Sequence, residues 1–200
     1  NALNWYCMNS EIENSVDESM VIKSETMSAL NANIIAFAML LPIAITCIVT
    51  FVLVWGWQPF LEGFTFLRSH QVLLLLILIL GIILHEGLHG VTWGLFAKGH
   101  LKSIRFGIKW AYLTPYCHCN EPLKRNHYLL GGIMPGLVLG LLPVIVALIY
   151  GYGWLLLLGI FFIGAAGGDL MVLFKLIKVD KKHLIQDHPK EIGFLVLRER

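Results

Sequence analysis

The sequence predicts an all-α polytopic membrane protein with four transmembrane helices and a small cytoplasmic β element. First, the chain of 200 residues is 57% hydrophobic and only 14% charged, whereas soluble domains have about 25% charged residues. Second, its apolar residues form uninterrupted runs long enough to cross a bilayer, with Trp and Tyr at their ends. This composition excludes an ordinary soluble globule, a disordered chain and a disulfide-stapled secreted domain. The net charge of +2 does not fit a nucleic-acid binder.

Four segments are long enough to span the hydrocarbon core, which takes about 20 apolar residues. The expected spans are residues 33–57, 71–97, 128–150 and 154–176. The Gly-Tyr-Gly sequence between the last two spans predicts a tight hairpin. Residues 1–32 form a polar, acidic N-terminal segment that lacks the pattern of a cleaved signal peptide. The chain begins without methionine, so the residues before Asn1 are left open.

The positions of lysine and arginine predict the orientation of these spans. Arg68 is alone in the loop between the first and second spans, and the hairpin after the third span has no basic residue. The other fourteen lie in the N-terminal segment, in the loop at 98–127, or from the end of the fourth span onward, including the tail at 177–200. The positive-inside rule then places both termini and the loop in the cytoplasm. We therefore expect a multi-pass protein of the cell membrane.

The loop and the tail each contain a strand-like stretch. Hydrophobic residues at 104, 106, 108 and 110 alternate with Arg, Gly and Lys, a period of two that indicates a strand. Residues 192–197 are also strand-like, and we expect a small cytoplasmic sheet that pairs the two pieces. Glycines at four-residue spacing in the last three spans favour close helix packing. Residues 71–176 are therefore the expected core, and residues 33–57 a peripheral helix.

The second span contains the sequence His-Glu-Gly-Leu-His at 85–89. Three ionisable side chains are costly to place in an apolar membrane helix, so they are candidate functional residues. His85 and His89 are four residues apart, so both rings project from one face of a helix and suit two nitrogen ligands on one zinc ion. Glu86 lies beside them and can accept a proton from a water that the metal activates. This is the pattern of zinc metallopeptidases. A haem site fits poorly, because ligands four apart on one helix cannot lie on opposite faces of one porphyrin.

A catalytic zinc site needs a third protein ligand, and the fourth span offers Asp169. It is the only acidic residue between Glu121 and Asp180. At about 1.5 Å per residue, His89 and Asp169 both lie roughly 9–14 Å below the inner membrane surface. The depths agree, although the orientation was derived without these residues. The alternative is a single aspartate that reaches to the interface.

Pro135 and Gly136 follow Met134 in the third span and predict a local break in that helix. Irregular backbone at membrane depth is tolerated where it lines a cavity or is buried in protein. Pro135 and Gly136 are therefore candidate substrate-binding residues, and a simple kink is the alternative.

Two further motifs leave alternatives open. Cys117, His118 and Cys119 could bind a second metal or approach the first, since thiolate and imidazole suit zinc; a folded loop with reduced thiols is the other interpretation. The sequence Asp-His-Pro at 187–189 is typical of a polar turn before the last strand, and a catalytic role for Asp187 is the alternative.

These residues resemble the site-2 protease class of intramembrane zinc metalloproteases, which has His-Glu-x-x-His in one transmembrane helix and a metal-binding aspartate in a later one. More closely, the chain is similar to a bacterial family of membrane proteins called putative zincin peptidases. The resemblance covers about residues 70–198. It rests on the motifs at 85–89, 113–119, 134–136, 167–169 and 187–189. It implies zinc held by His85, His89 and Asp169, with Glu86 as general base.

The expected function is that of an intramembrane zinc endopeptidase, which hydrolyses a peptide bond of a membrane protein near the cytoplasmic leaflet. Its expected partners are a membrane-protein substrate and the lipid bilayer, with no nucleic acid and an oligomeric state left open. The alternative is a non-catalytic metal-binding scaffold or a small transporter component. Substitution of Glu86 separates the two, because only an enzyme needs a general base.

Overall fold

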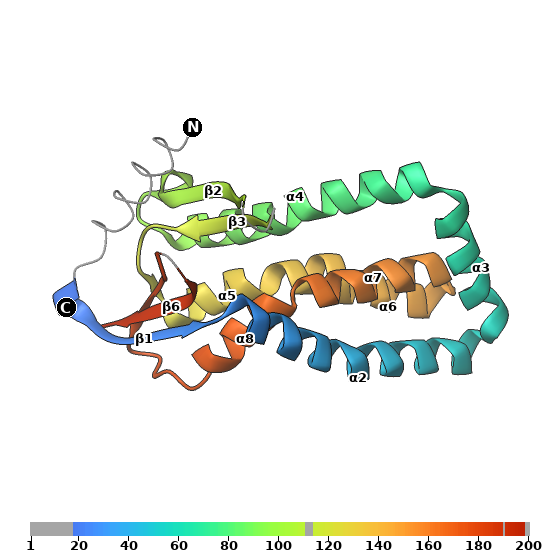
Figure 1. Ribbon diagram of the computed structural model, residues 1–200, viewed down its shortest axis with the longest axis horizontal. Helices are drawn as coiled ribbons and strands as arrows, with labels where there is room; N and C mark the ends of the chain where they lie inside the picture. The colour runs from blue at the N-terminus through green and yellow to red at the C-terminus, as the bar shows by residue number, and fades with distance from the viewer. Residues whose placement is uncertain (1–17, 111–113, 190, 199–200) are drawn as a thin grey trace. The chain divides into compact units, whose positions relative to one another are not determined.

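A computed structural model describes residues 18–110, 114–189 and 191–198, and these residues are mostly helical (Figure 1). Residues 1–17, with Cys7 and more than half of the predicted acidic segment, lie outside the described residues. The chain divides into two compact units. The helical unit contains Ala32–Leu88 and Ile133–Met171. The sheet unit contains the described residues of 18–31, 89–132 and 172–198.

The helices follow the predicted spans closely. They are α2 (Ala29–Trp55), α3 (Trp57–Ser69), α4 (Gln71–Phe96), α5 (Arg125–Pro135), α6 (Leu142–Tyr150), α7 (Gly153–Ala165) and α8 (Gly167–Leu176). Three stretches are long and apolar enough to cross a membrane: Asn33–Trp55, Gln71–Phe96 and Arg125–Tyr150. A fourth is present if α7 and α8, which meet at a bend of 50°, count as one span. Three to four candidate spans are thus confirmed by length and composition.

Three details differ from the prediction. Part of the loop between the first two spans is helical, as α3, because its proline (Pro59) lies in the first turn, where a proline is tolerated. The fourth span bends at Ala166, where two glycines of low helix propensity follow. The third span does not break at Pro135: helical dihedrals continue through this residue into the π-helical turn η3 (Gly136–Leu141) and then α6.

The core of the helical unit joins the first, third and fourth spans. Phe51, Val144, Ala147 and Leu156 form a buried cluster. The predicted hairpin is present, and Gly151 ends α6 in the left-handed conformation at φ 76°. These contacts fix the end of the bundle that is formed by the α3 turn and the hairpin.

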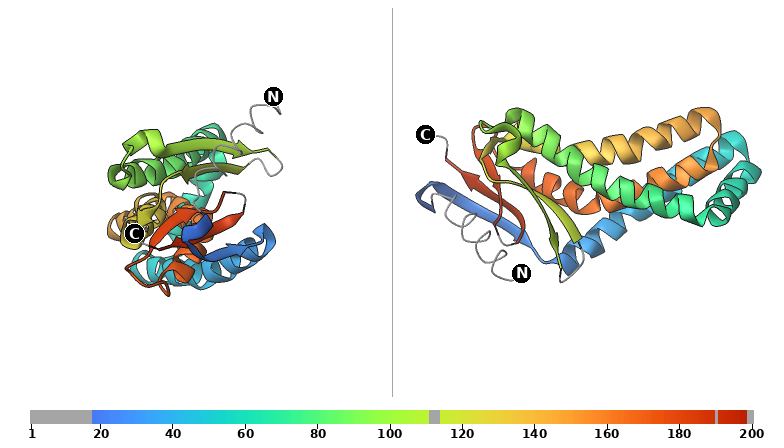
Figure 2. Two further views of the ribbon diagram at one scale, coloured as in Figure 1. Left: turned by 90° about the vertical axis from the view of Figure 1, so that its left-hand side faces the viewer. Right: turned by 90° about the horizontal axis from the view of Figure 1, so that it is seen from above.

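The sheet unit contains two antiparallel sheets instead of the single one expected. One has the order β1–β6–β5–β4, with β1 at Val21–Met27, β4 at Leu123–Lys124, β5 at Leu184–Asp187 and β6 at Ile192–Leu197. The other is a ribbon of β2 (Ile104–Lys109) and β3 (Thr114–Cys119), side by side in yellow-green in Figure 2. The predicted pairing of 104–110 with 192–197 is therefore wrong. Strand β2 pairs instead with the next strand, β3, since a short connection costs less closure entropy, while β6 pairs with its neighbour β5 and with the distant β1.

The turn that follows α4 is organised by one carboxylate. Glu121 accepts hydrogen bonds from the backbone N–H of Lys98 at 2.8 Å and of Gly99 at 3.1 Å. The Ser103 hydroxyl also donates to it, at 2.6 Å. The turn after α4 is thereby tied to the segment that leads from β3 to β4.

Candidate metal centre

His85 and His89 lie on one continuous helix, α4, one turn apart as predicted. The 26 residues of this helix are nearly all apolar and include no proline, lysine or arginine. Residues four apart on a helix lie on the same face, so the two rings extend from α4 in one direction. Glu86 follows His85 directly and precedes His89 by three residues. It is partly exposed.

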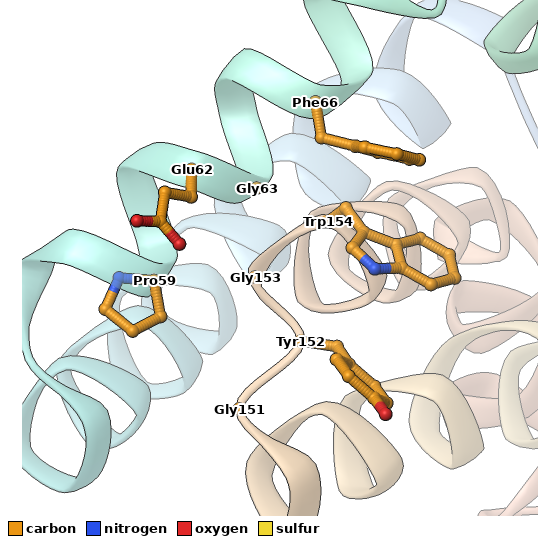
Figure 3. Close-up of a pocket in the computed structure, with 8 residues that line it drawn as sticks. All are labelled: Pro59, Glu62, Gly63, Phe66, Gly151, Tyr152, Gly153 and Trp154. Atoms are coloured by element: carbon orange, nitrogen blue, oxygen red, sulfur yellow. The ribbon is translucent and has the colours of Figure 1, made fainter.

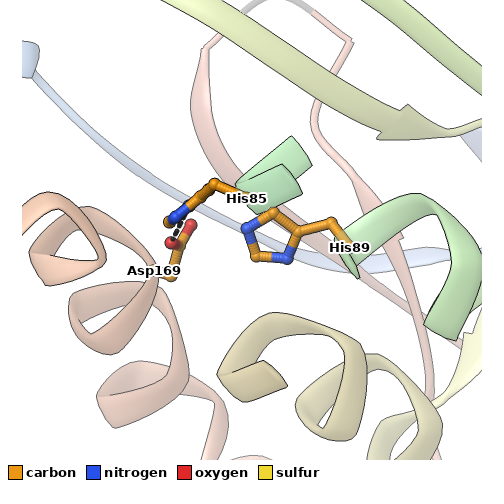
Figure 4. A group of neighbouring side chains, drawn as sticks. All are labelled: His85, His89 and Asp169. Carbon is orange, nitrogen blue, oxygen red and sulfur yellow. Dashed lines mark hydrogen bonds and ion pairs between the residues drawn. The ribbon is translucent and has the colours of Figure 1, made fainter. Parts of the chain in front are cut away.

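Asp169 reaches His85 from the first turn of α8. The Asp169 Oδ2 atom lies 3.1 Å from His85 Nε2 (Figure 4). A carboxylate in the first turn of a helix is favoured by the helix dipole. At the other end of α8, the buried Arg125 side chain donates to the carbonyls of Leu176 at 3.2 Å and Ile177 at 2.8 Å. The last turn of α8 therefore has its unpaired carbonyls satisfied.

The three candidate ligands form one group. One ligand atom from each of His85, His89 and Asp169 lies within 4.8 Å of the other two, and Figure 4 shows the His89 ring extending toward the other pair. Two zinc ligands at tetrahedral angles are about 3.3 Å apart, close to the 3.1 Å between His85 and Asp169. Two imidazoles and one carboxylate are a catalytic zinc donor set that keeps one position open. Among the described residues, no other His, Cys, Asp and Glu cluster has this geometry.

His89 is oriented by a contact that the sequence did not reveal. Its Nδ1–H donates to the carbonyl oxygen of Gly131 at 2.9 Å, because a carbonyl can only accept. The ring is 4% exposed and stacks on Trp93 at 5.0 Å between ring centres. Bonding at Nδ1 fixes the tautomer and leaves Nε2 with a lone pair for a metal. This is the usual support of a metal-binding histidine.

The support continues through a line of aromatic rings to Asp187. Trp93 also stacks on Tyr128, at 5.1 Å, and its Nε1–H donates to the Tyr128 carbonyl at 3.0 Å. The Tyr128 hydroxyl donates to Asp187, which also accepts from the Cys119 N–H at 2.8 Å. Asp187 therefore joins α5, β3 and β5. Asp187 is the last residue of β5, and its contact with the end of this aromatic line had no sequence signal.

The Cys-His-Cys motif lies on strand β3, where alternate side chains point to opposite faces. Cys117 and Cys119 share one face and His118 takes the other, where its Nδ1 lies 3.7 Å from Asp187. The three side chains therefore cannot close on one ion. Cys119 is buried and donates to the Glu121 carbonyl, and burial raises the pKa of its thiol to about 12. This favours the alternative of reduced thiols in a folded segment.

Pro135 and Gly136 lie at the junction of α5 and the π-helical turn. Pro135 is fully buried. A Cβ placed on Gly136 would meet the Ala166 side chain at 3.4 Å. Their assignment to substrate binding stays a prediction, and so does the role of Glu86. A cavity of about 270 Å³ in the helical unit lies between α3 and the hairpin before α7 (Figure 3). None of the predicted site residues lines it.

Two histidines one turn apart, a glutamate beside the first and a carboxylate from another helix are typical of zinc peptidases as a class. The sequence model of a family described as "Putative zincin peptidase" matches residues 78–184, more than half of the chain. The chain belongs to this family. The matched range includes His85, Glu86, His89 and Asp169. Comparisons with curated proteins and with solved structures find no match. Membership of a zincin family implies a metallopeptidase that uses zinc.

Proposed function

We propose that this chain is an intramembrane zinc metalloendopeptidase that cuts a membrane protein near the cytoplasmic leaflet. The observation that carries the proposal is the grouping of His85, His89 and Asp169 within 4.8 Å. Helix α4 is long and apolar enough to cross a bilayer, and α8 is so when it is counted with α7 as one bent span. Ionisable groups are retained at such depth where they serve a function. The ligand set is that of the site-2 protease type, which supports the finer assignment.

The ligands are supplied by His85, His89 and Asp169, and zinc, when bound, activates a water molecule and polarises the scissile carbonyl as a Lewis acid. Glu86 is the general base. Its carboxylate accepts a proton from the attacking water and delivers that proton to the nitrogen of the leaving amine, so that the amide bond breaks without a free amide anion. The Gly131 carbonyl keeps His89 in one tautomer through the reaction.

The substrate is a transmembrane segment that unwinds near the site, because an intact helix shields its peptide bonds. The orientation expected from lysine and arginine places both termini and the strands of the sheet unit in the cytoplasm. Water then enters from the cytoplasmic side, where α4 ends at Phe96. On this proposal the partners are the bilayer and a membrane-protein substrate.

Glu86→Gln tests the proposal. The protein, purified in detergent and reconstituted in liposomes, is mixed with single-span peptides of varied sequence, and mass spectrometry follows the cleavage. Zinc is measured by elemental mass spectrometry. General acid–base catalysis contributes about 10²–10⁴-fold, so we expect Glu86→Gln to lose at least 100-fold in rate and to keep about one zinc per chain.

Glu62→Gln is the matched control, because Glu62 is an exposed glutamate of α3 outside the metal group. Its rate and zinc content should equal those of the wild type. Cleavage by Glu86→Gln at the wild-type rate would exclude Glu86 as the base. Zinc binding with no cleavage of any peptide would favour the alternative of a metal-binding scaffold or transporter component.

A further inference from the structure

We propose that Pro135 is a positioning residue for His89, because it leaves the Gly131 carbonyl free to accept the His89 Nδ1–H bond. The inference rests on the proposed role of His89 as a zinc ligand. It concerns a residue that lies outside the metal group of His85, His89 and Asp169.

The argument begins with spacing along one helix. In an α-helix the carbonyl of residue i accepts from the N–H of residue i+4. Gly131 and Pro135 are four apart in α5, and Pro135 has helical dihedrals at φ −61° and ψ −43°. Proline has no N–H, and its ring crowds the carbonyl of residue i−4 and tilts it from the helix axis. The carbonyl that would normally be consumed by the helix ladder is the Gly131 carbonyl.

The carbonyl that proline frees in this way is the one that His89 uses. His89 Nδ1 lies 2.9 Å from Gly131 O, and the ring is buried. A buried imidazole N–H without an acceptor would cost free energy. The proline thus supplies a backbone acceptor inside an apolar helix, where side-chain acceptors would be costly to bury.

The lack of a side chain at Gly131 matters as well. A Cβ at this position would lie 2.1 Å from the Trp93 ring, which stacks on His89. Trp93 therefore packs directly against the backbone of α5 beside the carbonyl. The Gly131 backbone packs against the Trp93 ring and also accepts the hydrogen bond from His89 Nδ1–H. The orientation of the carbonyl and the position of the imidazole are therefore coupled.

Pro135→Ala tests the inference. The new N–H points at the Gly131 carbonyl and competes with His89, while the helix gains a better helix former and should fold. Partners of metal-binding histidines change metal affinity by about 10–100-fold when mutated. We expect the dissociation constant for zinc to rise by about 10-fold and the visible spectrum of the Co²⁺-loaded protein to shift. In ¹⁵N-histidine spectra of the metal-free protein, His89 should lose its single Nδ1–H tautomer.

Two variants isolate the missing N–H. Lactic acid at position 135, introduced by amber suppression, has the alanine side chain and an ester oxygen in place of the N–H. It should bind zinc as the wild type does. Pro42→Ala is the matched control, because Pro42 also lies inside an apolar helix, α2, but frees a carbonyl far from α5 in sequence and not bonded to a histidine. It should leave zinc affinity, the Co²⁺ spectrum and the His89 tautomer unchanged.

Unchanged zinc affinity and tautomer in Pro135→Ala would overturn the inference. So would a lactic-acid variant as weak as Pro135→Ala, since the ring and not the absent N–H would then matter. The tautomer is read without zinc or substrate. A failure of the peptidase proposal, in which the wild type cleaves no peptide, is therefore distinguishable from a failure of this inference.

Discussion

Helix α2 of the helical unit and strand β6 of the sheet unit differ in whether their apolar side chains are exposed. Along α2, large apolar side chains are exposed, as Leu53 is at 81%. Only 6% of the most apolar stretch of this helix is buried. In β6, by contrast, four successive residues from Phe194 to Leu197 are buried. Folded soluble domains rarely expose large contiguous apolar surfaces. The comparison teaches that the exposed face of α2 is of the kind that suits a bilayer, whereas the apolar residues of β6 are already covered by protein.

The boundary between the two units lies between the two histidines of α4, and the two side chains have different kinds of hydrogen-bond partner. His85 contacts a candidate metal ligand, Asp169. His89 contacts groups that are not ligands: the Gly131 carbonyl and the Trp93 ring, behind which Tyr128 bonds to Asp187. A change to the Asp169 carboxylate should therefore lower zinc affinity directly. A change to the Asp187 carboxylate should first lower the stability of the fold.

The same substitution at two aspartates gives the largest expected contrast. Structural zinc sites bind with about 10–16 kcal/mol, so loss of one anionic ligand in Asp169→Asn should weaken zinc on the order of 10²- to 10³-fold, with stability little changed. Asp187→Asn leaves the Cys119 N–H an acceptor but perturbs a buried bond from Tyr128, which should lower the free energy of unfolding by about 1–3 kcal/mol. Zinc titration and denaturant unfolding in detergent measure the two effects. Equal zinc loss in both variants, measured on folded protein, would contradict the contrast.

A lysine placed on each unit tests which solvent it faces. Ile45 in the middle of α2 and Ile22 in β1 are 59% and 49% exposed. A lysine at the centre of a membrane helix costs about 2.5–3.5 kcal/mol of insertion, whereas an exposed lysine on a strand in water costs little. Ile45→Lys should therefore reduce the membrane-integrated fraction, measured by carbonate extraction, and Ile22→Lys should not. Equal integration of both variants would mean that α2 does not face lipid.

The parts of this protein that follow local rules were predictable, and the parts that depend on distant contacts were not. Apolar runs marked the spans, and four-residue spacing placed His85 and His89 on one face. The grouping with Asp169 was predicted from its depth, from its being the only acidic residue between Glu121 and Asp180, and from the family resemblance, and the structure brings the three side chains together. Strand pairing failed because period two indicates a strand but not its partner. Strand β1 was missed because Lys23, Ser24 and Glu25 interrupt its alternation.

The hydrogen bond that orients His89 shows why the partners of metal-ligand candidates are hard to predict from sequence. The acceptor is a backbone carbonyl, which every residue has, so Gly131 carries no chemical mark. Only the four-residue interval to Pro135 signals that this carbonyl is free, and the interval gains meaning once α5 is known to continue through the proline. The π-helical turn that follows was likewise expected only as a break.

The smallest expected effect concerns the edge of the sheet unit. A hydrogen bond from Lys23, outweighing partial burial, and a bond from Lys175 lower the pKa of Glu25 below its usual value. Lys175 also donates to the Thr26 carbonyl at 3.0 Å, so these charges hold β1. Because the folded pKa is below the unfolded one, this stabilisation is complete above the unfolded pKa and is lost as pH falls through the folded pKa.

Glu25 is partly exposed, so its contribution should be below about 1 kcal/mol and should shrink with added salt. The protection of β1 amides from exchange, corrected for intrinsic rates, should be greater in the wild type than in Glu25→Gln at pH 6. This difference should shrink as the pH falls to 3. A constant difference over this range would show that Glu25 does not hold the strand by charge. Because these ion pairs contact β1 and not α2, acid should loosen β1 while leaving the membrane-integrated fraction unchanged.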